Sequence, residues 1–114
     1  MVKRTLLLLS LVVIYTGCGD TSCEDEADSY RYRKCSIKVT KKQFNGRWFM
    51  IEGTNVTNGH QNKFAGLGRW YPLFSQYIEI GDTVVKHKDE LVFYVHKKDT
   101  LLTFPYKCGG QIIE

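Results

Sequence analysis

Few residues of this sequence have the types and spacing that catalysis requires. The histidines, His60, His87 and His96, stand in polar or lysine-flanked surroundings, and we expect them to be solvated. The chain lacks the Gly-x-Ser-x-Gly, His-Glu-x-x-His and glycine-rich loop motifs that position a nucleophile, a zinc ion or a phosphate. Acidic pairs such as Asp89-Glu90 fall at expected turns, where nothing would tune the pKa of a carboxylate. The sequence therefore predicts no enzyme, no catalytic residue, no metal site and no cofactor.

Disulfide formation is the chemistry that the sequence does support. The four cysteines are Cys18, Cys23, Cys35 and Cys108, and no Cys-x-x-Cys pair indicates a zinc site. Cys35 is expected just before the first strand and Cys108 just after the last, so a Cys35–Cys108 bridge would staple the two ends of a small sheet. The alternative is a bridge between Cys23 and Cys108. Whether Cys18 is retained in the mature chain stays open.

The first 19 residues have the layout of a secretory signal peptide. Lys3 and Arg4 precede an apolar or small stretch from Leu6 to Gly17. This stretch is shorter than the roughly 20 residues of a membrane span, so we expect no stable membrane insertion. The mature chain should begin close to Asp20. The protein is therefore expected to be secreted and extracellular, where cysteines form disulfides.

Charge and one modification motif bound the possible partners. The formal net charge of +4 falls to about +2 without Lys3 and Arg4, which is too low to predict nucleic-acid binding. Asn55-Val56-Thr57 is an N-glycosylation acceptor in a polar stretch, so we predict glycosylation of Asn55 on an exposed loop.

The mature chain is rich in β-branched and aromatic residues with frequent turn signals, which indicates an all-β fold. We expect an extended acidic and basic arm over 20–34 and a single domain over 35–114, after the signal peptide of 1–19. No segment shows a sustained helical period of apolar residues. Pro72 and Pro105 are expected at edges or bulges. Strands are predicted near 46–53, 69–80, 83–87, 90–97 and 100–107, with turns at 54–59, 81–82, 88–89 and 98–99.

The segment Phe44-Asn45-Gly46-Arg47-Trp48-Phe49-Met50-Ile51 resembles the first signature of the lipocalin family. Val95-His96-Lys97-Lys98-Asp99 is similar to part of the second signature. The resemblance implies an antiparallel barrel in which Gly46 lets a short helical turn pack against the first strand and Trp48 plugs the closed end. The chain is short for the family and lacks a counterpart of its last strand, so an incomplete barrel is one form that this fold could take.

The resemblance also implies a small hydrophobic ligand that the barrel sequesters or carries. Residues of shared parity on the expected strands would line its interior: Phe74, Ile78, Ile80, Leu91, Phe93 and Val95. The alternative function is an extracellular protein-interaction module that has no ligand cavity and binds a protein partner through its surface. A filled core with an exposed apolar patch would favour this alternative.

An immunoglobulin-like β-sandwich is the alternative fold. Cys35, Trp48 and Tyr106-Lys107-Cys108 mimic its Cys, Trp and Tyr-x-Cys spacing. Against it, Arg31 and Arg33 occupy positions that should point into the sandwich. Six residues after Cys108 are also too few for its last strand.

Overall fold

The computed structural model describes residues 21–114. The expected signal peptide and the fate of Cys18 lie outside these residues. The described chain runs in this order: α2 Thr21–Arg31, β1 Cys35–Asn45, β2 Trp48–Asn55, β3 Gln61–Leu67, the 3-10 turns η1 Tyr71–Leu73 and η2 Ser75–Tyr77, β4 Thr83–Lys86, β5 Val92–His96, β6 Leu101–Pro105, β7 Lys107–Cys108 and β8 Gln111–Ile112.

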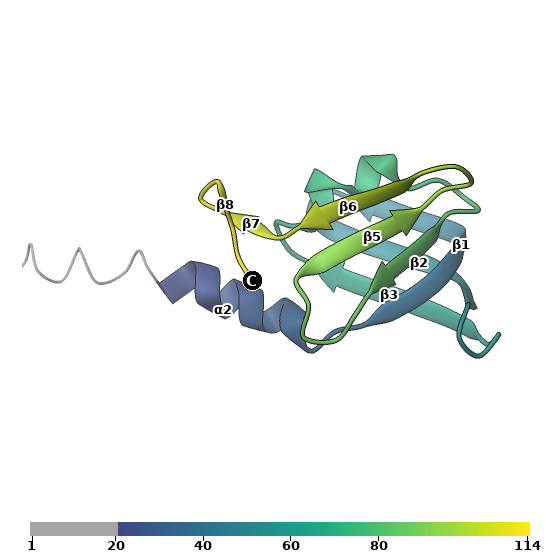
Figure 1. Cartoon of the computed structure of the whole chain (residues 1–114), viewed down its shortest axis with the longest axis horizontal. Coiled ribbons are helices and arrows are strands. Elements are labelled where there is room, and N and C mark those ends of the chain that lie inside the picture. Colours follow the sequence, from purple (N-terminus) through teal and green to yellow (C-terminus); the bar gives the residue numbers. More distant parts are fainter. Residues whose placement is uncertain (1–20) are drawn as a thin grey trace, which may run out of the picture.

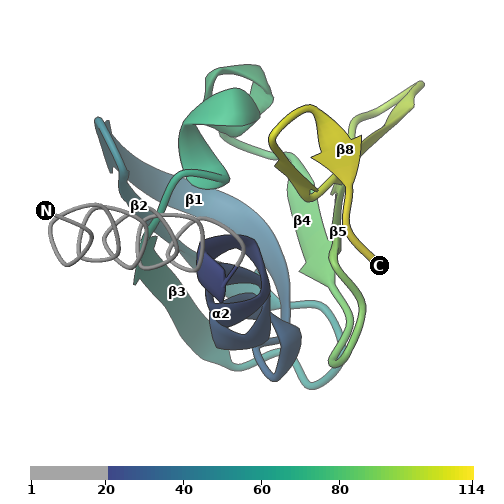
Figure 2. The ribbon, with the colours of Figure 1, turned by 90° about the vertical axis from the view of Figure 1, so that its left-hand side faces the viewer.

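Six strands form one antiparallel sheet in the order β3-β2-β1-β4-β5-β6, and β7 and β8 form a separate small hairpin (Figure 1). The chain crosses from β3 to β4 through η1 and η2. The view along the helix shows a curved sheet with α2 standing across one end of its concave side (Figure 2). The predicted all-β class is therefore confirmed. The sheet does not close into a barrel, because β3 and β6 are its two ends and do not pair with each other.

Residues 21–31 form a helix, not the extended arm that the acidic composition suggested. Cys23, Ala27 and Tyr30 recur at helical spacing and point toward the body of the protein, where Ala27 and Tyr30 are buried. Glu24 in the first turn and Arg31 in the last turn complement the helix dipole. Three positions are too short a pattern for periodicity to stand out in the sequence.

Two strands of the six-stranded sheet and the short strand β8 were not predicted, and one predicted strand is absent. β1 carries the alternating residues Ile37 and Val39, but its ladder to β2 shifts register between Val39 and Lys41, and polar residues follow. β3 is polar at its start and contains Gly66. The segment 69–80 forms η1 and η2 because Pro72 supports a helical turn and cannot donate in a ladder.

Gly46 lies in a two-residue hairpin turn between β1 and β2, where Asn45 and Trp48 are paired. Its φ of +57° is a conformation that glycine adopts without steric cost. The segment 44–51 is thus the end of one strand, a tight turn and the start of the next. The helical turn that the lipocalin resemblance implied for Gly46 is not present.

Aromatic rings fill the concave side of the sheet. The Phe49 ring stacks on Tyr71 with centroids 4.8 Å apart, and Phe93 packs against Phe74 at 4.6 Å and Trp70 at 4.8 Å. Tyr30 of α2 and Tyr106, after β6, close one end of this cluster. Burial of so many large rings is the dominant favourable contribution to folding in a domain of this size.

One disulfide joins the helix to the end of the sheet. Cys23 of α2 is bonded to Cys108 of β7, with the Cα atoms 5.9 Å apart. The predicted bridge between Cys35 and Cys108 is therefore wrong, and the alternative pairing is the one present. Cys35 points into the core at the start of β1 and is a buried free thiol. The folding of 21–31 into a helix is what brings Cys23 to the end of the sheet.

Candidate binding surface

The residues predicted to line a barrel interior lie in the packed core. Phe74, Ile78, Phe93 and Val95 are fully buried and Leu91 is nearly so, whereas Ile80 is 57% exposed. The side chains of the five buried residues belong to the aromatic-rich core on the concave side of the sheet. The parity argument thus found core residues. It failed at Ile80 because 69–80 is not a strand.

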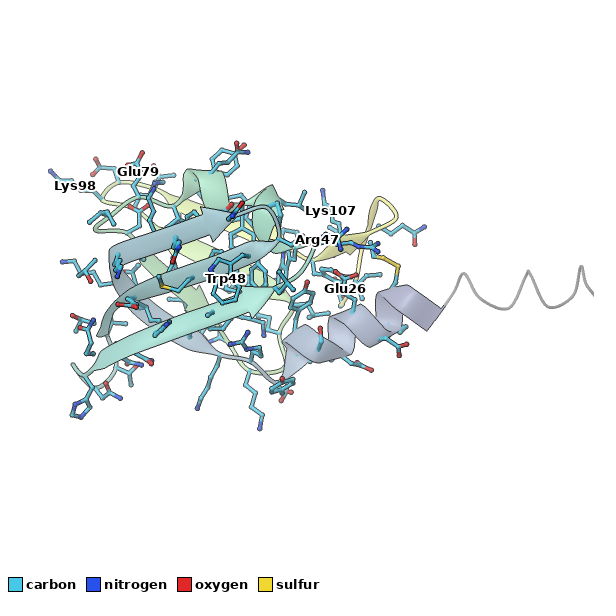
Figure 3. All side chains as sticks on the ribbon, turned by 180° about the vertical axis from the view of Figure 1, so that it is seen from behind. Glu26, Arg47, Trp48, Glu79, Lys98 and Lys107 are labelled. Atoms are coloured by element: carbon cyan, nitrogen blue, oxygen red, sulfur yellow. A yellow bond between two sulfur atoms is a disulfide. The ribbon has the colours of Figure 1, made fainter. Side chains whose placement is uncertain are left out.

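Trp48 lies on the outer, convex face of the sheet and is 38% exposed (Figure 3). The predicted role as a buried plug is therefore wrong for Trp48. The fully buried tryptophan is Trp70, which follows β3 and packs in the core at 1% exposure. Gly46-Arg47-Trp48 and Gly68-Arg69-Trp70 look alike in sequence, and only tertiary packing distinguishes the two tryptophans.

Trp48 belongs to an exposed apolar patch at the β3 end of the sheet. Its cross-strand partner is Leu67 of β3, which is 73% exposed. The next outward pair is Met50 with Ala65, of which Ala65 is partly exposed and Met50 is only 4% exposed. We call these four residues the outer patch. Sequence reasoning missed Leu67 and Ala65 because it did not find β3.

The outer patch borders a strand edge with free backbone groups. Beyond the turn end of the β2–β3 ladder, the Asn55 N–H donates to the His60 carbonyl (2.8 Å). In an antiparallel ladder every second pair is bonded in this way, so Asn62, Phe64 and Gly66 of β3 also bond to β2. The N–H and C=O groups that point away from β2 therefore belong to the other parity: Gln61, Lys63, Ala65 and Leu67. The N–H of Lys63 does donate outside the ladder, to the side-chain Oδ1 of Asn62 (2.8 Å).

The opposite edge, β6, is less suited to pairing. The Tyr106 N–H donates to the Leu91 carbonyl (2.9 Å), so the outward groups of β6 belong to Leu101, Thr103 and Pro105. Pro105 has no N–H, and β6 is five residues long against seven for β3. The longer edge, free of proline, is thus the one beside the outer patch.

Positive charge is concentrated on the same side of the sheet. From Cys35 to Leu67 the only acidic residue is Glu52, whereas five residues are basic: Lys38, Lys41, Lys42, Arg47 and Lys63. Glu52 is also partly neutralised by Lys63, with 3.9 Å between the charged atoms. Lys38, Lys41 and Lys63 are exposed. They lie on the outer face of the sheet, because Lys38 pairs with Thr54 and both Lys41 and Lys63 pair with Glu52.

Cys35 is the free thiol among residues 21–114, but its surroundings do not activate it as a nucleophile. Burial raises the pKa of the Cys35 thiol to about 12, although a backbone hydrogen bond from Lys86 and the charge of Lys86 act in the opposite direction. Burial also lowers the pKa of Lys86. The Lys86 ammonium donates to the carbonyls of Arg33 (2.7 Å) and His87 (3.1 Å) and, at 3.4 Å, to that of Arg31 at the end of α2. Lys86 therefore anchors the helix terminus.

Within residues 21–114, no three His, Cys, Asp or Glu side chains gather in a way that could hold a metal ion. In the same part of the chain no helix has the length and apolarity that crossing a membrane requires. No protein-family model, curated protein or solved structure matches the chain significantly. The fold and surface define a small antiparallel β protein, stapled by a disulfide, in which the open edge of β3 borders an apolar patch.

Proposed function

We propose that this protein is a secreted interaction module that binds an extended, acidic segment of a partner protein along the free edge of β3. The observation that carries the proposal is the juxtaposition of outward amide groups on β3 with the outer patch. In this mode, called strand addition, main-chain hydrogen bonds supply affinity, and pockets or patches for alternate side chains supply specificity.

The geometry at the Leu67 end of β3 favours such a partner. A strand added beside β3 would pair with the outward groups of Ala65 and Leu67 and with the carbonyl of Lys63, and its outward side chains would lie next to these three residues. An apolar residue there would cover Leu67 and extend the contact of Trp48. Burying an exposed leucine contributes roughly 1.5–3 kcal/mol, enough to orient the partner.

The charge of the partner follows from the basic residues on this face. Lys63 lies in the middle of the edge, and a lysine at that position opposes pairing of β3 with a second copy of itself. An acidic segment would instead meet Lys63 and, beyond β2, Lys41. Two copies of this chain are therefore a poorer fit than an acidic partner.

A hydrophobic ligand inside the sheet is less well supported, because the five buried residues predicted to line the cavity pack against one another and the aromatic cluster. The lipocalin relationship remains a prediction carried by residues 44–51 and, in part, by residues 95–99. Secretion is part of the proposal. The Cys23–Cys108 disulfide supports it, since such bridges persist in oxidising compartments. Asn55, the last residue of β2, is the proposed glycosylation site.

The test is selection of random twelve-residue peptides, displayed on phage, against immobilised protein that comprises residues 21–114. Enriched peptides should be acidic and rich in β-branched residues. Ala65→Pro removes one outward N–H and should weaken their binding at least tenfold, whereas the matched control Thr103→Pro on the opposite edge should leave it unchanged. Equal loss in both variants, or enriched peptides without acidic bias, would contradict the proposal. Retention on heparin without peptide enrichment would indicate a sulfated glycan instead.

A further inference from the structure

A second surface feature lies far from β3 in the sheet order, where β5 begins and β6 ends. It is a half-open groove of about 570 Å³. Its volume falls in the range of small-molecule sites, roughly 300–1,000 Å³.

The groove is built from three segments that hydrogen bonds hold together. The Tyr106 N–H donates to the Leu91 carbonyl (2.9 Å), which joins the end of β6 to the start of β5. The Ile113 N–H donates to the Tyr106 carbonyl (2.9 Å), which fixes the segment after β8 as a further wall. Arg31 of α2 donates to the carbonyl of Glu114 (2.9 Å) and holds the end of that wall. The groove thus has a preformed framework.

The walls are apolar and the rim is acidic. Leu91, Val92, Pro105, Ile112 and Ile113 supply the apolar surface, and Ile112 is 54% exposed. Three carboxylates, of Asp89, Glu90 and Glu114, border the groove, against the lysine Lys88 and the weakly basic His87. The acidic excess stands out in a chain that is basic overall.

One side-chain oxygen of Glu90 is a buried, unsatisfied hydrogen-bond acceptor within the described part of the chain. This atom, Oε1, is buried and has no hydrogen-bond partner among the described residues, although the side chain as a whole is partly exposed. A hydrogen bond to Glu90, followed by burial, raises the pKa of the Tyr94 hydroxyl, but this bond leaves Oε1 without a donor. A buried carboxylate oxygen without a hydrogen-bond donor is energetically unfavourable. Glu90 itself lines the groove, so a donor group on a ligand bound there would lie beside its carboxylate.

We propose that this groove is a binding site for a small cationic amphiphile, whose apolar body lies against Leu91 and Ile112 and whose ammonium head donates to the Glu90 carboxylate. The proposal does not depend on the function assigned to β3. An ammonium group has several N–H donors and the charge that the three rim carboxylates favour. A carboxylate of the same length would meet repulsion from the rim and could not donate.

The test is titration of the ¹⁵N-labelled protein with octylammonium chloride, followed by amide resonances, with sodium octanoate as the matched anion. Octylammonium should produce saturable shifts confined to the groove, at Leu91, Val92 and Ile113. It should bind at least tenfold more tightly than octanoate. Glu90→Gln should reduce this preference at least fivefold, whereas the control Asp99→Asn, on the β5–β6 turn, should leave it unchanged.

A second variant keeps the test decisive if Glu90→Gln folds poorly. Ile112→Ser alters an exposed wall residue and should weaken octylammonium at least threefold while preserving the spectrum of the free protein. Equal affinity for octanoate, shifts that do not saturate, or shifts that lie outside the groove would each overturn the proposal. So would an unchanged preference in folded Glu90→Gln.

Discussion

Removal of the Cys23–Cys108 disulfide should destabilise this protein more than any other change to its cysteines. The bridge joins residues separated by 85 positions. Loop-closure entropy for a loop of that length predicts a stabilisation of about 4.5 kcal/mol at 25 °C, an upper figure because residual structure in the unfolded chain reduces it. In a domain of this size each kcal/mol shifts Tm by about 4–8 °C. The double variant Cys23→Ser/Cys108→Ser should therefore melt up to about 18–36 °C below the wild type.

The assay is thermal unfolding followed by circular dichroism, under oxidising conditions and at several scan rates. The control is Cys35→Ala, which removes a small buried side chain and leaves the bridge intact. Its Tm should stay well above that of the double variant. A loss below about 1 kcal/mol in the double variant, or a peptide map with Cys35 bonded to Cys108, would refute the reasoning.

Three further predictions concern the core, pH and modification. Trp70→Ala should lower the free energy of unfolding by about 3–5 kcal/mol because it empties a fully buried site, whereas Trp48→Ala should change it by less than about 1 kcal/mol. Urea unfolding of both variants measures the difference. Similar losses in the two variants would count against the assignment of Trp70 to the core and Trp48 to the surface. Burial raises the pKa of the Cys35 thiol to about 12 from an ordinary value near 9. The contribution of the buried, protonated thiol to the free energy of unfolding is therefore complete below pH 9 and is lost as pH rises toward 12. Wild type should thus lose about 2 kcal/mol more than Cys35→Ala between pH 8 and 10.5, and parallel pH profiles would contradict this. Asn55 should carry an N-glycan when the chain is secreted from a eukaryotic cell, with a mass shift that disappears in Asn55→Gln; an unmodified wild-type mass would show that the motif is not used.

Local sequence signals predicted the second half of the sheet well. The hairpins around Lys88-Asp89 and Lys98-Asp99 are where turn residues separate β-branched runs, and β4, β5 and β6 lie close to their expected positions. Pro105 does end an edge strand, as its missing N–H requires. Here the local preference and the tertiary environment agree.

The first half was harder because tertiary contacts override weak local patterns. α2 shows its buried stripe at only three positions, and β3 has a polar start and a glycine where the Tyr71 hydroxyl approaches Gly66. The Cys23–Cys108 bridge became geometrically possible only with the helix in place. Parity identified the core residues Phe93 and Val95 correctly, but it could not show whether they line a cavity or fill it.

The candidate surface was predictable only as a class. A filled core and an exposed apolar patch are the marks of an interaction module, but the sequence holds no direct sign of where the patch lies. Leu67 pairs with Trp48 across β2 and β3, a contact that depends on the register of a strand that was not expected. Which backbone groups of β3 point outward also follows from that register.

The most direct test of the central claim is hydrogen exchange of the β3 amides, with and without a peptide selected on this protein. In the free protein the outward amides of Ala65 and Leu67 should exchange quickly, while those of Phe64 and Gly66, bonded to β2, should be protected. Strand addition predicts that the peptide slows exchange at Ala65 and Leu67 at least tenfold and leaves the outward amide of Thr103 on β6 unchanged. Tight binding with no added protection at Ala65 and Leu67 would contradict the account.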